Sequence, residues 1–107
     1  MNEAFKLAVM KSMEDFGLRV RMHCDYDAEQ FCILKTLLSE LATALRDEAH
    51  IDKDLALDLY ALPQIVRNMF LSYEGPATSR PAQFDRLEDA WVDIDSLVLD
   101  CLQPPAA

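Results

Sequence analysis

The chain has 107 residues, of which 51% are hydrophobic and 27% charged, with two glycines and five prolines. This length fits one domain with its own core, and the composition excludes collagen-like, low-complexity and wholly disordered classes. Two glycines cannot supply the turns of a β-sandwich, so helices are expected. Ten basic residues stand against 19 acidic ones, for a net charge of −9, which disfavours direct binding to nucleic acid or to an anionic membrane.

The first helix is expected from about residue 3 to about residue 24. Apolar residues at helical spacing define its inner side before Gly17 interrupts the pattern; they are Phe5, Val9, Met13 and Phe16. Residues 18–24 then alternate between apolar and polar, which by itself indicates a strand. Every other apolar segment is helical, so we favour a continued helix. The alternative is an edge strand that pairs with a second chain.

A second helix is predicted over residues 28–49. Its apolar stripe has the alternating three- and four-residue spacing of a heptad seam and consists of Phe31, Leu34, Leu38, Leu41 and Leu45. Asp27 is expected to cap the first turn, with Gln30 reaching back in a variant of the capping box. Ile33 and Leu37 widen the stripe, which is typical of a helix that contacts two neighbours in a bundle.

A third helix is predicted after Asp52, its expected N-cap. Its stripe consists of Leu55, Leu59, Leu62, Val66, Met69 and Tyr73 and passes through Pro63. Proline inside a helix removes one backbone hydrogen bond, so either one kinked helix or two shorter helices would satisfy the pattern. The unbroken register favours the kinked helix, which Gly75 and Pro76 end.

A loop over residues 75–82 leads to the last predicted helix, which begins near Pro81, a residue suited to a first turn. Its stripe consists of Phe84, Leu87, Trp91, Ile94, Val98 and Cys101. Four amphipathic helices joined by short loops predict an all-α fold, an antiparallel four-helix bundle. Residues 1–103 are expected to form a single helical domain, and residues 104–107 a frayed C-terminal tail.

A cytoplasmic location is expected from the absence of targeting signals. Charged residues interrupt the N-terminal apolar stretch, unlike in a signal peptide, and no run approaches the roughly 20 apolar residues of a membrane span. Cys24, Cys32 and Cys101 form neither a CxxC pair nor an even disulfide set, so they are expected to be reduced thiols.

No catalytic, cofactor-binding or metal-binding residue is predicted, so the protein is not expected to be an enzyme. A di-metal bundle needs two Glu-x-x-His pairs, and only Asp47 and His50 have a related spacing; His50 is instead expected to satisfy the last carbonyls of the second helix. Cys24 directly follows His23, but adjacent helical residues do not face each other. Two glycines are too few for a Gly-rich phosphate loop.

The placement of acidic residues is the feature that points to a partner. Residues 2–24 hold four basic and three acidic residues, whereas residues 75–107 hold two basic and six acidic ones. Acidic residues recur every three or four positions along the last helix, although like charges at this spacing disfavour an isolated helix. The predicted partner-binding residues are Asp85, Glu88, Asp89, Asp93, Asp95 and Asp100, together with Asp47 and Glu48. The alternative is a face that is merely solvated.

A small acidic helical protein without catalytic residues can act by covering a basic cleft of another protein. In size, charge and architecture, though in no motif, the chain resembles bacterial immunity proteins, which neutralise nuclease toxins, and acidic phage inhibitors that imitate nucleic acid. This resemblance implies a stoichiometric inhibitor of a basic, nuclease-like protein.

The alternative function is that of a secretion chaperone or a homo-oligomeric regulatory bundle, a homodimer for example, which associates through exposed apolar surface. Two segments could supply that surface in the monomer, the first with Phe70, Leu71 and Tyr73, the second with Leu18, Val20 and Met22.

Overall fold

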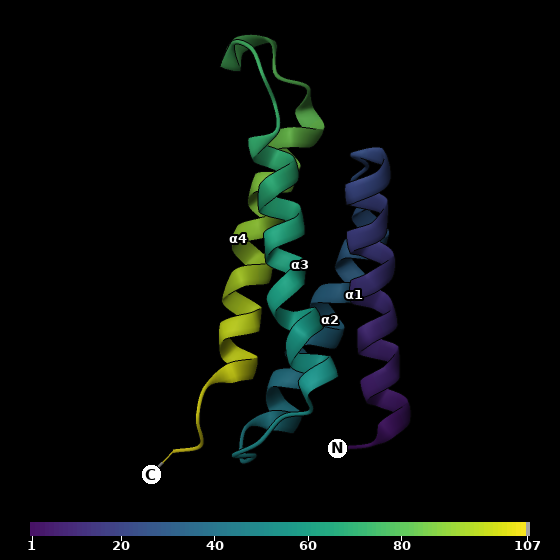
Figure 1. The fold of residues 1–107 in the computed structure, drawn as a ribbon, viewed down its shortest axis with the longest axis vertical. Helices are drawn as coiled ribbons and strands as arrows, with labels where there is room; N and C mark the ends of the chain where they lie inside the picture. Colours follow the sequence, from purple (N-terminus) through teal and green to yellow (C-terminus); the bar gives the residue numbers. More distant parts are fainter. Residues whose placement is uncertain (107) are drawn as a thin grey trace.

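The computed structural model describes residues 1–106, which form four α-helices that run up and down along one long axis (Figure 1). The helices are α1 (Glu3–His23), α2 (Ala28–Leu45), α3 (Lys53–Leu71) and α4 (Ala82–Leu102), with a 3-10 turn, η1 (Ala77–Ser79), before α4. The molecule measures 48 × 28 × 21 Å. The predicted all-α four-helix bundle is confirmed.

The helices surround the core in the order α1, α2, α4, α3. Helix α1 packs against α2 and α3, and α4 packs against the same two helices, so α1 and α4 face each other only across the core. Helices that follow each other in the chain are antiparallel (Figure 1). The link between α2 and α3 crosses one end of the bundle diagonally, so α1 runs parallel to its neighbour α3, and α2 runs parallel to α4.

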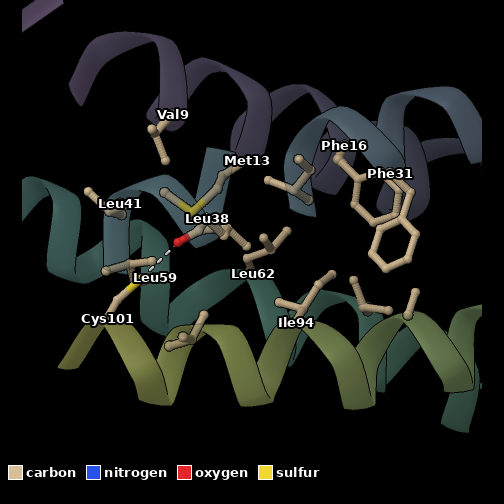
Figure 2. Packing of buried hydrophobic residues seen from close by; sticks show 14 of the residues in the cluster. Val9, Met13, Phe16, Phe31, Leu38, Leu41, Leu59, Leu62, Ile94 and Cys101 are labelled. Atoms are coloured by element: carbon tan, nitrogen blue, oxygen red, sulfur yellow. Dashed lines mark hydrogen bonds between the residues drawn. The ribbon is translucent and has the colours of Figure 1, made fainter. Parts of the chain in front are cut away.

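The core consists mainly of the apolar stripes read from the sequence, although Tyr73 and Phe84 are half-buried and lie outside it. Figure 2 shows how side chains from all four helices meet there, for example Met13, Leu38, Leu59 and Ile94, each at most 2% exposed. At roughly 1.5 to 3 kcal/mol for each large apolar side chain, this burial is the main stabilising contribution. Within residues 1–106, no helix is both long enough and apolar enough to cross a membrane.

Helix α1 continues through Gly17 to His23, so the alternating segment is helical and the strand alternative is wrong. Val20 is fully buried, whereas Leu18 and Met22 are 52% and 63% exposed, as expected for neighbours on a helix rather than on one side of a strand. Asn2 caps α1, because its Oδ1 accepts hydrogen bonds from the amides of the first turn.

The predicted start of α2 is confirmed, but its end differs. Asp27 Oδ1 accepts a hydrogen bond from the Gln30 backbone amide at 2.8 Å. The Gln30 side chain does not complete a capping box, since its Oε1 is buried and no donor in residues 1–106 reaches it. Helix α2 ends at Leu45 instead of residue 49, because Glu48 and Ala49 are exposed and add no apolar side chain to the core.

Helix α3 is continuous through Pro63, so the version with two shorter helices is wrong. Asp52 occupies the N-cap position, but its side chain caps no amide of α3 and binds Lys6 instead. Residues 72–81 form the loop before α4, which lies at the opposite end of the bundle from the two termini (Figure 1). Of the predicted tail 104–107, Ala107 lies outside the described residues, and residues 104–106 have no regular secondary structure.

Candidate functional site

Four of the predicted acidic residues form a stripe on the outer surface of α4, on the side toward α2. This α4 acidic stripe consists of Asp85, Asp89, Asp93 and Asp100, which are all exposed. At about 100° per residue, these four positions fall within about 80° of one another on the helix circumference, outside the sector of the buried residues of α4. Burial raises the pKa of Tyr26, just before α2, and the negative charges of Asp89 and Asp93 add to that rise. Asp100 lines a shallow hollow together with Arg46, the residue directly after α2.

Glu88 and Asp95 lie on the other flank of α4, toward α3. They are three and four residues from Trp91, whose ring is covered by the guanidinium group of Arg67 from α3, 5.6 Å from the ring centroid. The six acidic residues of α4 therefore occupy two flanks of the helix. A single flat partner surface cannot contact both flanks equally.

Asp47 and Glu48 lie in the exposed turn after α2, at the end of the bundle where α4 also ends. Glu48 lines a hollow together with Cys101 and Leu102 of α4. The structure thus places these two residues at the Asp100 end of the stripe. Arg46, exposed and next to Asp47, reduces the negative charge there.

Fewer of the acidic residues of α4 form ion pairs than of the acidic residues elsewhere in the chain. Of the six, only Asp85 forms an ion pair, with Arg80 of the preceding loop at 2.5 Å; no basic nitrogen of residues 1–106 comes within 4.0 Å of the other five. Elsewhere, cations bind six further carboxylates: Lys6 binds Glu3, Asp52 and Asp54, Lys11 binds Asp15, and Arg19 binds Asp25 and Asp27. Asp85 is thus already engaged within the molecule, while the rest of the stripe is available.

The residues weighed for catalysis or metal binding are not brought together. Asp47 and His50 follow the end of α2 and share no helix face, and His23 lies at the opposite end of the bundle. In the described part of the chain, no three His, Cys, Asp or Glu side chains gather as metal ligands would. Cys24 ends α1 in the left-handed region, at φ 49°.

Cys101 belongs to the core. Its thiol donates a hydrogen bond to the carbonyl oxygen of Leu38 over 3.5 Å, drawn as the dashed line in Figure 2. Burial, with a smaller contribution from Asp100, raises the pKa of this thiol to about 11. A thiol that stays protonated and covered is unreactive, so Cys101 has a packing role.

The sequence did not predict a groove between α1 and α3. Its volume is about 280 Å³, and its apolar lining includes Leu18, Leu62 and Ile65. Two acidic side chains, Glu14 of α1 and Asp58 of α3, line it beside Gly17, Ala61, Met13 and Arg21. The sequence shows Gly17 and Asp58 beside apolar stripes, but not that these two sides of α1 and α3 meet.

Asp58 is the most perturbed carboxyl group of this groove. Desolvation raises its pKa to about 6, and the adjacent carboxyl of Glu14 and the charge of Asp54 contribute further. Its Oδ2 is buried, and no hydrogen-bond donor of residues 1–106 reaches it. The Glu14 carboxyl can share a proton with Asp58 but offers no positive charge, so the carboxylate form of Asp58 lacks a cation.

Comparison of the chain with protein-family models, with curated proteins and with solved structures found no match. No relative therefore supplies a fold family, an activity or a partner. The charges and exposed surfaces of the bundle are the basis for a functional hypothesis.

Proposed function

We propose that this chain is a non-enzymatic protein-binding module, a stoichiometric inhibitor of immunity type that covers a basic, nuclease-like protein in the cytoplasm. The contact surface is the α4 acidic stripe, extended at one end by Asp47 and Glu48. Glu88 and Asp95 contact the same partner only if it also wraps around the α3 side of α4. The partner is a protein rather than nucleic acid or a membrane.

The observation that carries this proposal is the lack of intramolecular ion pairs at Asp89, Asp93 and Asp100. Each is exposed, and no cation of residues 1–106 lies within 4.0 Å. Unpaired charges of one sign along a helix attract an oppositely charged protein and accelerate association, with an effect that salt screens. Their mutual repulsion weakens α4 slightly, and a basic partner would remove that cost.

The test begins with the complex that the chain forms in its own cell. Native mass spectrometry of the tagged, intact chain is expected to detect a one-to-one complex with a basic protein. The isolated partner should have nuclease activity that one equivalent of the chain abolishes. A bound acidic protein, or no bound protein, would contradict the proposal.

The contact surface is tested by a triple variant, Asp89→Asn with Asp93→Asn and Asp100→Asn. We expect association with the partner to slow by about tenfold or more at low salt and to become less sensitive to salt. The matched control is the triple variant of Glu29→Gln, Glu40→Gln and Glu74→Gln. It has the same net charge but removes exposed charges that lie off α4, so its association rate should stay within about twofold of the native rate. Equal slowing in both variants would show that only net charge matters.

A second candidate function is association through apolar surface, as a secretion chaperone or a homo-oligomeric bundle. The exposure of Leu18, Met22 and Leu71, at 52%, 63% and 57%, favours it. The other three residues predicted for this apolar surface are less accessible: Val20 is buried, and Phe70 and Tyr73 are half-buried. Binding of an unfolded or apolar client that survives the triple Asn substitution would favour this candidate over the acidic inhibitor.

A further inference from the structure

The side of the bundle formed by α1 and α3, here called the α1/α3 face, lies opposite the side formed by α2 and α4. It has an apolar surface on both helices. Leu7 and Leu18 of α1 and Leu57 of α3 are 53%, 52% and 65% exposed, and the groove described above lies between the two helices. Exposed leucines around an apolar groove are typical of a protein contact surface.

The face carries charges of both signs with a negative excess, since Lys6 alone binds Glu3, Asp52 and Asp54 where α1 meets the start of α3. Lys11 and Asp15 neutralise each other at 3.0 Å. Glu14 and Asp58 form a carboxyl pair in the groove, and Arg21 lines the same groove without an acidic group of residues 1–106 within 4.0 Å. The groove therefore contains a carboxyl pair, Glu14 and Asp58, without a cation, and an arginine, Arg21, without an acidic partner.

Arg21 forms no ion pair with Asp58 or Glu14 of the same molecule, although all three line the groove. Seven residues separate Glu14 from Arg21, which corresponds to two helical turns or roughly 10.5 Å. Asp58 Oδ2 thus remains buried without a donor from residues 1–106. A cation from outside the molecule would satisfy it.

We propose that the α1/α3 face binds a second copy of this chain about a twofold axis that passes near Gly17 and Leu18. Such an axis lies midway between Glu14 and Arg21, so it would bring Arg21 of each copy to the carboxyl pair of the other. A twofold interface requires this reciprocity, in which one residue contacts a second and the second contacts the first. Gly17 is buried against Leu62 and Ile65 of α3 in its own molecule, whereas Leu18 beside it is exposed, so Leu18 of each copy enters the groove of the other.

Charge favours a second copy over a different protein at this face. Arg21 and the carboxyl pair of Glu14 and Asp58 line one groove, so a second copy offers a complementary group at each of two reciprocal contacts. The α4 acidic stripe lies on the opposite side of the bundle, so dimerisation keeps the two stripes apart and leaves both accessible. The dimer does not depend on the proposed inhibitor function, and neither activity blocks the other.

Sedimentation equilibrium of the intact chain tests the dimer, over roughly 1 to 300 µM at pH 7.5. Arg21→Glu places like charges at both reciprocal contacts, and we expect its dissociation constant to rise at least about tenfold. Glu14→Arg is expected to weaken the homodimer similarly. Far-UV circular dichroism checks that both variants, altered at exposed positions, keep the helix content of the native chain.

The decisive sample is an equimolar mixture of the two variants. The arginine introduced at position 14 of one chain then faces the glutamate introduced at position 21 of the other, while the native contact forms at the second site. The heterodimer should therefore bind at least about tenfold more tightly than either homodimer. Arg86→Glu is the matched control for Arg21→Glu, because it reverses an exposed arginine of α4, and it should keep native affinity.

Three results would overturn the proposal: a monomer throughout the concentration range, a dimer that Arg21→Glu leaves intact, or a mixture that binds no more tightly than its components. The triple Asn variant of the acidic stripe should dimerise normally. Failure of the dimer and failure of the inhibitor function are therefore seen in separate measurements.

Discussion

Replacement of Asp58 by asparagine should stabilise the folded monomer at neutral pH. The pKa of Asp58 is raised from its ordinary 3.8 to about 6, so between these values the folded state binds a proton that the unfolded state does not. The free energy of unfolding therefore falls as pH rises through this window and stays low above it. An asparagine at this position carries no charge and can donate a hydrogen bond to Glu14, so the variant should lack this decline.

The magnitude follows from the size of the pKa change. A rise from 3.8 to about 6 corresponds to at most about 3 kcal/mol of unfolding free energy. The groove is open to solvent on one side and Asp58 is only half-buried, so screening reduces the expected gain to about 1 kcal/mol. Near pH 4 the aspartate is almost fully protonated in the folded state and roughly half protonated in the unfolded state, so most of the stability difference between the two proteins should have disappeared.

Urea unfolding at pH 4, 6 and 7.5, followed by far-UV circular dichroism, measures this difference. The protein is kept at low micromolar concentration, so that self-association does not alter the carboxyl pair. Asp95→Asn, an exposed change of the same chemistry on α4, is the control and should leave the pH dependence as in the native chain. Parallel stability curves for the native chain and the Asp58→Asn variant, or a loss of stability in the variant at pH 7.5, would refute the assignment.

Three further changes test the packing. Gly17→Ala should raise the free energy of unfolding by about 0.5 to 1 kcal/mol in thermal or urea unfolding, because alanine favours helix. The new Cβ would lie 3.4 Å from Leu62, an ordinary contact. A loss of stability would mean that α1 and α3 cannot accept a methyl group there. Gly75→Ala should have the opposite sign, a cost of about 1 to 3 kcal/mol, since Gly75 has φ +128° and a Cβ would lie 3.1 Å from the Tyr73 hydroxyl. Exposed Cys32 should react readily with iodoacetamide, whereas Cys101, with a pKa of about 11, should react about a hundredfold more slowly than a free thiol on protonation grounds alone. Peptide mass spectrometry of both cysteines in native and urea-unfolded protein measures this, and equal native rates would show that Cys101 is not covered.

The core was predictable because each apolar stripe repeats at helical spacing over several turns. Leu34, Leu38 and Leu41 are fully buried as the heptad spacing indicates. The alternating segment after Gly17 was ambiguous on local grounds, and the absence of a partner strand decided it correctly. Agreement with the helical pattern of the other segments was therefore more informative than the local pattern at residues 18–24.

The groove was not predictable, because it depends on which helices become neighbours. Glu14 and Asp58 meet only because the α2–α3 link crosses the bundle diagonally and places α3 beside α1. The apolar stripes would be buried equally well if α3 lay beside α2, and in that arrangement these two carboxyls would lie diagonally apart. Periodicity determines which side of a helix is buried but does not choose its neighbours.

The bundle uses its few paired cations to connect elements rather than to neutralise α4. Lys6 joins α1 to the start of α3 through Asp52, at 2.8 Å, and Arg19 joins α1 to the link before α2 through Asp25, at 2.6 Å. Arg80 fixes the loop before α4, where it also lies over the Phe70 ring at 5.1 Å. Within residues 1–106, the two ion pairs that lie inside a single helix are Lys11 with Asp15 and Lys6 with Glu3, both in α1. The chain has only ten basic residues for 19 acidic ones. Because several of these cations pair with carboxylates at the connections, the negative charges of α4 remain largely uncompensated. A triple Asn variant of the stripe should therefore keep the native fold and stability while losing association rate, since no connection between helices involves these carboxylates.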